Sequence, residues 1–161
     1  MPLHLAVERG TGFTTFHDSV ELDSEHPVQF IDITELVAER VRRSSVSHGI
    51  VTVQSLHTTA ALAVNENEPL LLEDLTSLLE RFAPHDARYR HDDLARRHPS
   101  TPPDERPNGH AHARAVVLAA SVTLHVVDGK LTRGQWQRIF LVELDGLRRR
   151  NVSILVMGVA A

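Results

Sequence analysis

Runs of β-branched and aromatic residues, bounded by turn-forming residues, recur along the chain. Residues 12–22 and 27–33 are two such runs, and the turn-prone D-S-E-H-P between them predicts that they pair as the first two strands. The later runs are shorter and separated by polar or glycine-containing segments. We expect further strands at residues 50–56, 60–64, 121–127, 135–144 and 151–159.

Two segments have the spacing of helices. Thr34 is predicted to be the N-cap of a helix that is ended by the serine-rich sequence before Gly49. Pro69, in a first helical turn, begins the clearest helix, and Pro84 stops it. Its apolar residues fall at i, i+4, i+7 and i+11 and are expected to bury one stripe. That stripe consists of Leu71, Leu75, Leu78 and Phe82.

Residues 83–107 are polar and rich in proline, so this stretch is predicted to be a long loop, and loops of this length are usually functional or disordered. Asp-Gly pairs at 128–129 and 145–146 separate the last strands, and Asp-Gly is a strong hairpin signal. The length of the chain suits one α+β domain over residues 1–161. Because the turns are too short for parallel crossovers, we expect a largely antiparallel sheet with two or three helices packed on one side.

The composition is that of a globular domain. Apolar residues make up 42% of the 161 and charged residues 24%, and the net charge is −4. This balance predicts no nucleic-acid partner. The longest apolar run, residues 115–120, is far too short to span a membrane, so we expect a cytoplasmic protein without a membrane partner. Cysteine is absent, which excludes disulfides, thiolate nucleophiles and zinc sites built on cysteine.

Histidine is in excess, because 11 residues in 161 is about three times the usage expected from an average of about 2%. His57 follows an apolar strand, so its imidazole is expected at the rim of the sheet, beside the hydroxyls of Thr58 and Thr59. There it can face a pocket, or it can simply close a turn. Both interpretations remain open at this point.

The segment N-E-N-E at residues 65–68 precedes the helix that begins at Pro69. Asn and Glu at a helix start are typical of capping and of favourable charge–dipole interaction, which is a structural alternative for Glu66 and Asn67. Asn65 is harder to explain in that way, because it interrupts an alternating strand at its tip. We therefore retain these residues as candidates for a functional site.

The segment N-G-H-A-H at residues 108–112 allows two local structures. If it is extended, His110 and His112 point to one face and can bind one metal ion together. If a helix begins at residue 109, Asn108 becomes the N-cap, and the first backbone amides together with Arg114 form an anion site. A third alternative is that both histidines are solvated loop residues.

The remaining polar clusters lie in the long loop and in the last strands. Y-R-H-D-D at residues 89–93 either closes over a ligand or is solvated, and its carboxylates suit magnesium or the support of metal-bound imidazoles. Trp136 is predicted to be in the core, with Gln135 and Gln137 on the opposite, pocket-facing side of the strand. Residues 148–150, all arginine, either are solvated or bind phosphate.

Taken together, several motifs resemble the YjbQ family, which is described as secondary thiamine-phosphate synthases. The motifs are H-T-T-A at 57–60, N-E-N-E at 65–68, Y-R-H-D at 89–92, N-x-H-A-H at 108–112, G-K-L at 129–131, G-x-W-Q at 134–137 and E-x-D-G at 143–146. The resemblance implies a small, mostly antiparallel α+β fold that assembles as a homotrimer, with pockets near the subunit boundaries.

The resemblance also implies an activity that joins a hydroxymethylpyrimidine diphosphate to a thiazole phosphate with release of diphosphate. The chain departs from the family pattern at Gln135 and at Leu147, where the family usually has threonine and proline, and these changes concern turn geometry. The residues that match the pattern are His57, Thr58, Thr59, Asn65, Glu66, Asn67, His91, Asp92, Asn108, His110, His112, Gln137, Glu143 and Asp145.

Three functions follow from these candidates, and the first is a transferase for a small phosphorylated substrate. Its catalytic candidates are His57, Asn65, Glu66, Asp92 and Glu143. Its substrate-binding candidates are Thr58, Thr59, Asn67, Asn108, Arg114, Gln137, Asp145, Arg148 and Arg149. Cations stabilise a departing diphosphate, and a divalent ion, Zn²⁺ or Mg²⁺, is a possible cofactor.

The second function is a metal-dependent hydrolase. In it, His57, His110 and His112 hold zinc and leave one position open for water, and Glu66 or Asp92 is the base. The third is a ligand-binding homotrimer without catalysis, in which the polar clusters lie between subunits.

Overall fold

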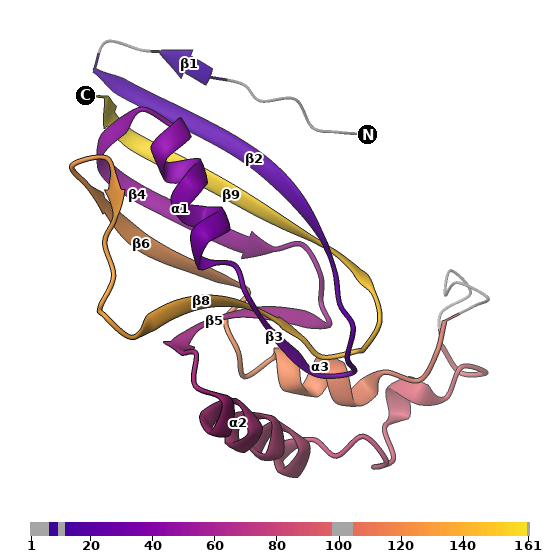
Figure 1. Ribbon diagram of the computed structural model, residues 1–161. Coiled ribbons are helices and arrows are strands. Elements are labelled where there is room, and N and C mark those ends of the chain that lie inside the picture. The colour runs from indigo at the N-terminus through magenta and orange to yellow at the C-terminus, as the bar shows by residue number, and fades with distance from the viewer. Residues whose placement is uncertain (1–6, 10–11, 98–104, 161) are drawn as a thin grey trace.

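The computed structural model describes residues 7–9, 12–97 and 105–160, and it consists of two antiparallel sheets with three α-helices (Figure 1). The larger sheet has six strands in the order β1-β2-β9-β4-β6-β7. The mostly antiparallel α+β class expected from the sequence is confirmed. The strands of the larger sheet are β1 (Val7–Arg9), β2 (Phe13–Asp23), β4 (Val46–Ser55), β6 (Ser121–Val127), β7 (Lys130–Leu131) and β9 (Arg149–Ala160).

The smaller sheet has three strands in the order β3-β8-β5, with bounds Gln29–Asp32, Gln137–Glu143 and Ala60–Glu66. The predicted pairing of the first two long strands is therefore wrong. β2 pairs with β1 and β9, whereas β3 pairs with β8. The turn-prone segment between β2 and β3 carries the chain from one sheet to the other, and the N–H of Ser24 donates to the carbonyl of Arg148 there.

The two Asp-Gly pairs behave differently. Asp128 and Gly129 have φ angles of 51° and 69° and join β6 to β7 in the tight hairpin that their sequence predicts. Asp145 and Gly146 join β8 to β9, which lie in different sheets, so the second hairpin prediction is wrong. Gly146 has a φ of 61°, and a Cβ atom there would lie 2.7 Å from the Cα of Pro27.

Helix α1 (Thr34–Arg43) is present and ends at the serine-rich sequence as predicted, but its predicted N-cap differs. Ile33, not Thr34, occupies the N-cap position, and the Thr34 hydroxyl donates to Asp32 and accepts from the N–H of Ile139. The helix ends before Ser44, while Gly49 lies inside β4. A Cβ atom at Gly49 would lie 2.0 Å from the Met157 carbonyl oxygen, so glycine permits close strand packing rather than ending the helix.

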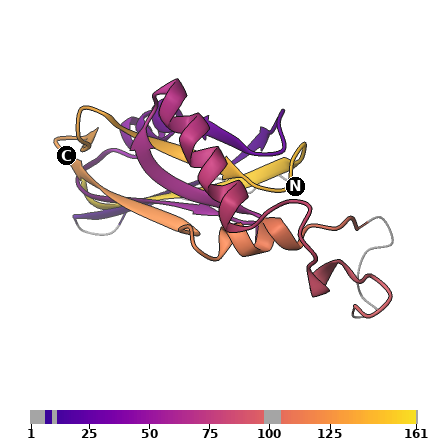
Figure 2. The same cartoon turned by 90° about the horizontal axis from the view of Figure 1, so that it is seen from below.

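Helix α2 (Pro69–Phe82) begins at Pro69 as predicted, and the Glu68 side chain accepts the N–H groups of Leu70 and Leu71. The predicted buried stripe is wrong. Leu79 is the buried residue of this helix, whereas Leu78 is 52% exposed and Phe82 54% exposed. The helix crosses the outer face of the small sheet (Figure 2), where Leu72 packs beside Leu79.

The small sheet is buried on both sides. Ile139 and Leu141 of β8 face the large sheet and α1, whereas Phe140 and Val142 face α2 and α3 (Gly109–Ala115). The helices therefore pack in two places: α1 on the inner face of the large sheet, and α2 and α3 on the outer face of the small one. Among the described residues, no helix has both the length and the apolar character needed to cross a membrane.

The long stretch that follows α2 is mostly irregular. Residues 83–97 and 105–107 contain no α-helix or strand, and their one short element is the 3-10 turn η1 (Arg90–Asp92). η1 lies beside α3, which brings the loop close to the segment N-G-H-A-H.

Candidate functional site

The predicted site residues separate into two groups at opposite ends of β8. Glu143 pairs with Ala60 at one end, and Gln137 pairs with Glu66 at the other. Six residue steps along a strand span about 20 Å, so the two groups cannot contact one small ligand within one chain. The group near Glu143 comprises His57, Thr58, Thr59, Asp92, Asn108, His110, His112, Glu143, Asp145 and Arg148.

The second group is held by local hydrogen bonds. Asn65 accepts the N–H of Glu66, Asn67 donates to Asp32 at 3.0 Å, and Gln137 accepts the N–H of Gly134. These local contacts favour a structural role for residues 65–68 over a role in binding a ligand. The nearby Trp136 is 65% exposed, so its predicted place in the core is wrong, because the chain turns there before β8 begins.

Glu143, predicted to be catalytic, is fully buried and forms an ion pair with Arg150, whose Nε lies 2.7 Å from Oε2. Its carboxylate also accepts the Ser24 hydroxyl and the N–H groups of Leu144 and Asp145. Burial alone raises the pKa of this carboxyl, but these hydrogen bonds and the Arg150 charge bring the pKa below its ordinary value. Glu143 is therefore ionised and holds the turn after β8.

His57 is half-buried in the connection between β4 and β5, and its Nε2 accepts the N–H of Asn151 at 2.7 Å. Burial, and then the charge of Arg150, lower the pKa of this imidazole. His57 is therefore neutral, with its proton on Nδ1 and its Nε2 lone pair already occupied. Thr58 is exposed beside it, and the carbonyl of Thr59 accepts a hydrogen bond from Arg150.

Residues 109–115 are helical, so the extended alternative for N-G-H-A-H is wrong. Asn108 is the N-cap residue, but its side chain makes no capping bond and donates instead to Glu105 and Asp145. The carboxylate of Asp92 accepts the N–H groups of Asn108 and Gly109 at 3.0 and 2.8 Å. The anion at this helix start is thus a side chain of the protein itself.

Helical geometry also separates the two histidines of H-A-H, since residues two apart differ by about 200° around the axis. The ring centre of His110 lies 4.6 Å from that of His85, and the ring centre of His112 lies 4.5 Å from that of His91. Within residues 7–9, 12–97 and 105–160, no three histidine or acidic side chains are grouped as a metal site. The structure thus does not assemble the predicted set of His57, His110 and His112.

Burial is the main reason that the pKa of His110 and the pKa of His112 both lie below their ordinary value. The neighbouring charge of Arg114 adds to the effect at His110, and that of His91 adds to it at His112. Both imidazoles are therefore neutral near pH 7 and keep a free lone pair.

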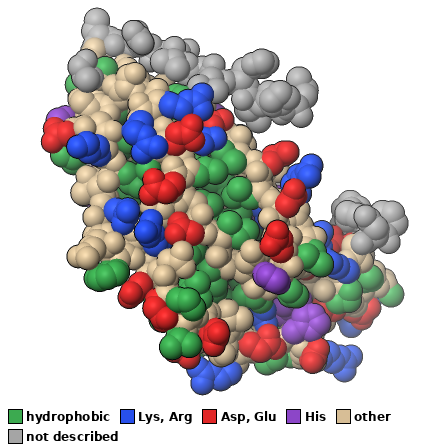
Figure 3. All heavy atoms as spheres, in the orientation of Figure 1, with side chains coloured by type: hydrophobic (Ala, Val, Ile, Leu, Met, Phe, Trp, Pro, Cys, Tyr) green, Lys and Arg blue, Asp and Glu red, His purple; other side chains and the backbone are tan. Residues whose placement is uncertain are grey.

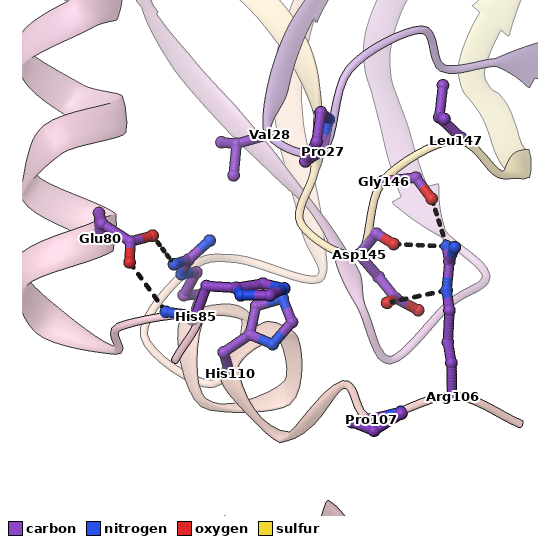
Figure 4. Close-up of a pocket in the computed structure, with 11 residues that line it drawn as sticks. Pro27, Val28, Glu80, His85, Arg106, Pro107, His110, Asp145, Gly146 and Leu147 are labelled. Carbon is purple, nitrogen blue, oxygen red and sulfur yellow. Dashed lines mark hydrogen bonds and ion pairs between the residues drawn. The ribbon is translucent and has the colours of Figure 1, made fainter. Parts of the chain in front are cut away.

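A cleft of about 440 Å³ opens beside α3, between the long loop and the turn after β8 (Figure 4). His85 and His110 lie on one side, and Asp145 and Arg106 lie on the other. Arg106 donates through Nη2 to the carbonyls of Asp145 and Gly146. The cleft therefore combines imidazole, guanidinium and carboxylate groups with an apolar rim of Pro27, Val28, Pro107 and Leu147.

Three arginines predicted to bind substrate have different surroundings. Arg114 is buried, pairs with Glu80 and donates to the carbonyl of Ala83, so it fastens α3 to the end of α2. Arg148 lies at the site, with its Nε 2.7 Å from an oxygen of Asp145. Arg149 is exposed and pairs with Asp23 on β2. Arg114 lines the cleft but is buried, whereas Arg148 is partly exposed beside Asp145, which lines the cleft.

The sequence interpretation missed His85 and Arg106, and it missed the role of Arg150 as the buried partner of Glu143. Arg150 was detectable, because alternation along β9 places it on the same inward face as Val152 and Ile154. His85 and Arg106 lie in the long polar loop, where no local pattern distinguishes a cleft residue from a solvated one. The face shown in Figure 3 intersperses acidic and basic side chains, and most of its histidine surface lies toward the end that carries the loop, with a smaller histidine patch at the opposite edge.

The chain has close relatives. A family model described as UPF0047 protein YjbQ-like matches residues 18–159. A UPF0047 protein of Methanothermobacter thermautotrophicus is 36% identical over 149 residues, which are 92% of this chain and 96% of the relative. A YbjQ-like protein of unknown function from Sulfolobus solfataricus has a solved structure with a TM-score of 0.81 at 33% identity. That similarity covers 91% of this chain and 99% of the other.

Proposed function

Because the chain belongs to the YjbQ-like UPF0047 family, we propose that it is a transferase of the thiamine-phosphate synthase kind, acting on phosphorylated substrates in the cleft beside α3. The observation that carries this proposal is the lining of the cleft. Imidazoles, a guanidinium and a carboxylate surround about 440 Å³, a volume within the range of small-molecule sites.

In the proposed reaction, the ring nitrogen of a thiazole phosphate attacks the methylene carbon of a hydroxymethylpyrimidine diphosphate. The carbon–oxygen bond to diphosphate breaks, and its electron pair leaves on the diphosphate oxygen. Negative charge therefore builds on the leaving group, and cations fixed beside it lower the barrier. A divalent ion such as Mg²⁺ on the diphosphate belongs to the proposal, because phosphate oxygens are its usual ligands.

Arg106 and Arg148 are the cations that we assign to the phosphates. The Arg106 side chain is 48% exposed, and its Nη2 is fixed by the carbonyls of Asp145 and Gly146. This anchoring orients the guanidinium, whose Nε also lies 3.7 Å from a carboxylate oxygen of Asp145. Arg114 is less suitable, since its side chain is only 1% exposed, whereas that of Arg148 is 34% exposed.

We also propose that the chain is a homotrimer, as the family resemblance implies. The polar groups at the two ends of β8 cannot meet within one chain, but the end of one chain can lie beside the opposite end of its neighbour. Exposed apolar side chains on α2, including Leu78 and Phe82, support self-association. Native mass spectrometry should give three times the mass of the chain, and a monomer at micromolar concentration would contradict the trimer.

The transferase is tested by incubating the protein with the two substrates and magnesium, and by measuring thiamine phosphate after oxidation to its fluorescent thiochrome form. Arg106→Ala should lower kcat/KM by about 10- to 100-fold, as expected when a cation is lost from a developing charge. Arg149→Ala is the matched control, because that arginine pairs with Asp23 outside the cleft. Absence of product from the wild-type protein would reject the transferase.

A ligand-binding homotrimer without catalysis is the second candidate, and one observation favours it. The carboxylates of Glu143 and Asp145 are engaged by Arg150 and Arg148, and none of these contacts requires a reacting group. This candidate predicts that calorimetry detects binding of a phosphorylated heterocycle, reduced by Arg106→Ala, in a protein that forms no product. The three-histidine hydrolase has no comparable support, because the three rings are not gathered.

A further inference from the structure

Four of the histidines form two close pairs on different faces of α3. His85 and His110 have ring centres 4.6 Å apart with planes at 57°, and His91 and His112 have ring centres 4.5 Å apart with planes at 68°. The first pair lines the cleft. The second lies between η1 and α3 and has no part in the function proposed above.

The ring separation is close to what a shared metal ion requires. With a zinc–nitrogen distance of about 2.1 Å and a ring centre about 1.1 Å behind the nitrogen, two imidazoles on one tetrahedral ion have centres about 5 Å apart. Both pairs approach this value. Distance alone therefore does not choose between them.

The hydrogen bonding of the rings does distinguish the two pairs. Nδ1 of His85 lies 2.8 Å from a carboxylate oxygen of Asp86. Nε2 of His91, in contrast, is buried and has no hydrogen-bond partner within the described part of the chain. A buried polar atom without a partner costs free energy, and an unoccupied ion site is one reason for such an atom.

The surroundings of His112 are mixed in charge. The carboxylates of Asp145 and Glu105 and the guanidinium of Arg97 lie near this ring. Both carboxylates are also paired with Arg148. The close ring pair and the buried Nε2 of His91 therefore indicate the ion site, rather than the surrounding charge.

We propose that His91 and His112 bind one divalent transition-metal ion of the zinc class, through Nε2 of His91 and a ring nitrogen of His112. Imidazole donors favour zinc, nickel or copper over magnesium. Two protein ligands leave the remaining positions for water or for oxygen atoms of a small anion. This site differs from the three-histidine set expected from the sequence, since it excludes His57 and His110.

The test is zinc binding to the full-length, untagged protein after removal of metals with a chelator. Isothermal titration with zinc chloride, without any substrate, should show one site per chain. His91→Ala and His112→Ala should each weaken binding at least about tenfold, as expected when a ligand is lost. His85→Ala and His110→Ala are the matched controls, because they disrupt the other pair on the same helix, and they should retain wild-type binding.

A second measurement keeps the test independent of whether the variants fold. X-ray absorption at the zinc edge on the wild-type protein should show two imidazoles among nitrogen and oxygen ligands. No zinc binding by the wild type, binding that survives both His91→Ala and His112→Ala, or binding lost in His110→Ala would each overturn the proposal. Because no substrate is present, the outcome is separate from that of the transferase assay.

Discussion

The Asp92 carboxylate accepts the backbone N–H of Gly109 at 2.8 Å, and this contact fastens the long loop to the first turn of α3. The same oxygen accepts the N–H of Asn108 at 3.0 Å. A helix start leaves several N–H groups without a partner inside the helix, and Asp92 supplies an acceptor from another part of the chain. The loop and the helix thus depend on one another for their positions.

Replacement of Asp92 by alanine should therefore destabilise the protein. We expect the free energy of unfolding to fall by about 1 to 2 kcal/mol, the usual cost of removing the acceptor at a helix N-terminus. Urea denaturation followed by circular dichroism measures this change. Asp93→Ala is the matched control, because the exposed Asp93 side chain forms a long ion pair to exposed Arg96, and equal stability of the two variants would contradict the anchoring role.

Replacement of Gly109 by alanine should also be unfavourable, although alanine is the better helix former. A Cβ atom at this position would lie 2.4 Å from the Cβ of Tyr89, so the loop would have to move. Overpacking of this kind costs about 1 to 3 kcal/mol, which exceeds the helical gain of about 1 kcal/mol. Gly134→Ala, where the nearest atom lies at 3.4 Å, should change the thermal melting temperature little by comparison.

Glu143→Gln should destabilise the protein more than either Asp92→Ala or Gly109→Ala. It leaves the Arg150 guanidinium buried without its counter-charge, and breaking a buried ion pair from one side costs about 3 to 5 kcal/mol. Asp23→Asn removes the partner of exposed Arg149 and should cost far less, because ion pairs at the surface contribute little to stability. Chemical denaturation of the Glu143 and Asp23 variants makes the comparison, and equal losses would show that Glu143 is not a buried anchor.

Acid should weaken the fold through its histidines. The pKa values of His57, His110 and His112 are all lowered in the folded state, mainly by burial. As pH falls below about 6.5, these histidines take up protons in the unfolded chain before they do so in the folded protein. Their contribution to the free energy of unfolding is therefore complete above that pH and is lost as pH falls toward their pKa values in the folded state. Urea denaturation between pH 8 and 5, with a chelator present, should show this decline.

The variant His57→Gln provides the check on that acid dependence. Glutamine retains an acceptor for the N–H of Asn151 but cannot be protonated in this range. The decline in unfolding free energy between pH 7 and 5 should therefore be shallower in this variant. A slope equal to that of the wild type would mean that His57 does not contribute.

Local sequence patterns predict where helices and strands lie better than they predict which strands pair with one another. The strands around residues 13–23 and 149–160, and the start of α2 at Pro69, are identified correctly because alternation and capping act within a few residues. The pairing of β2 with β9 joins segments more than a hundred residues apart, and nothing in either segment specifies the other. The same limit explains why the Asp145-Gly146 pair predicts a hairpin that does not form.

The site was predictable as a set of residues but not as an arrangement. Asn108, His110 and Asp145 stand out in their motifs, and the structure places them near one another. Their separation from Asn65 and Gln137 follows from the register of β5 on β8, which only the folded chain reveals. His85 meets His110 through tertiary packing of the long loop, for which the sequence carries no periodic signal.

The position of β9 between β2 and β4 has a consequence for biosynthesis. Both neighbours leave the ribosome well before β9, so the nascent chain holds two strands whose facing edges have no partner until β9 emerges. Such edges are prone to pair with other chains, and sheets closed by distant segments form slowly. We therefore expect the large sheet to close only after β9 has emerged, and expression yield to depend on chaperones that shield β2 and β4 until then.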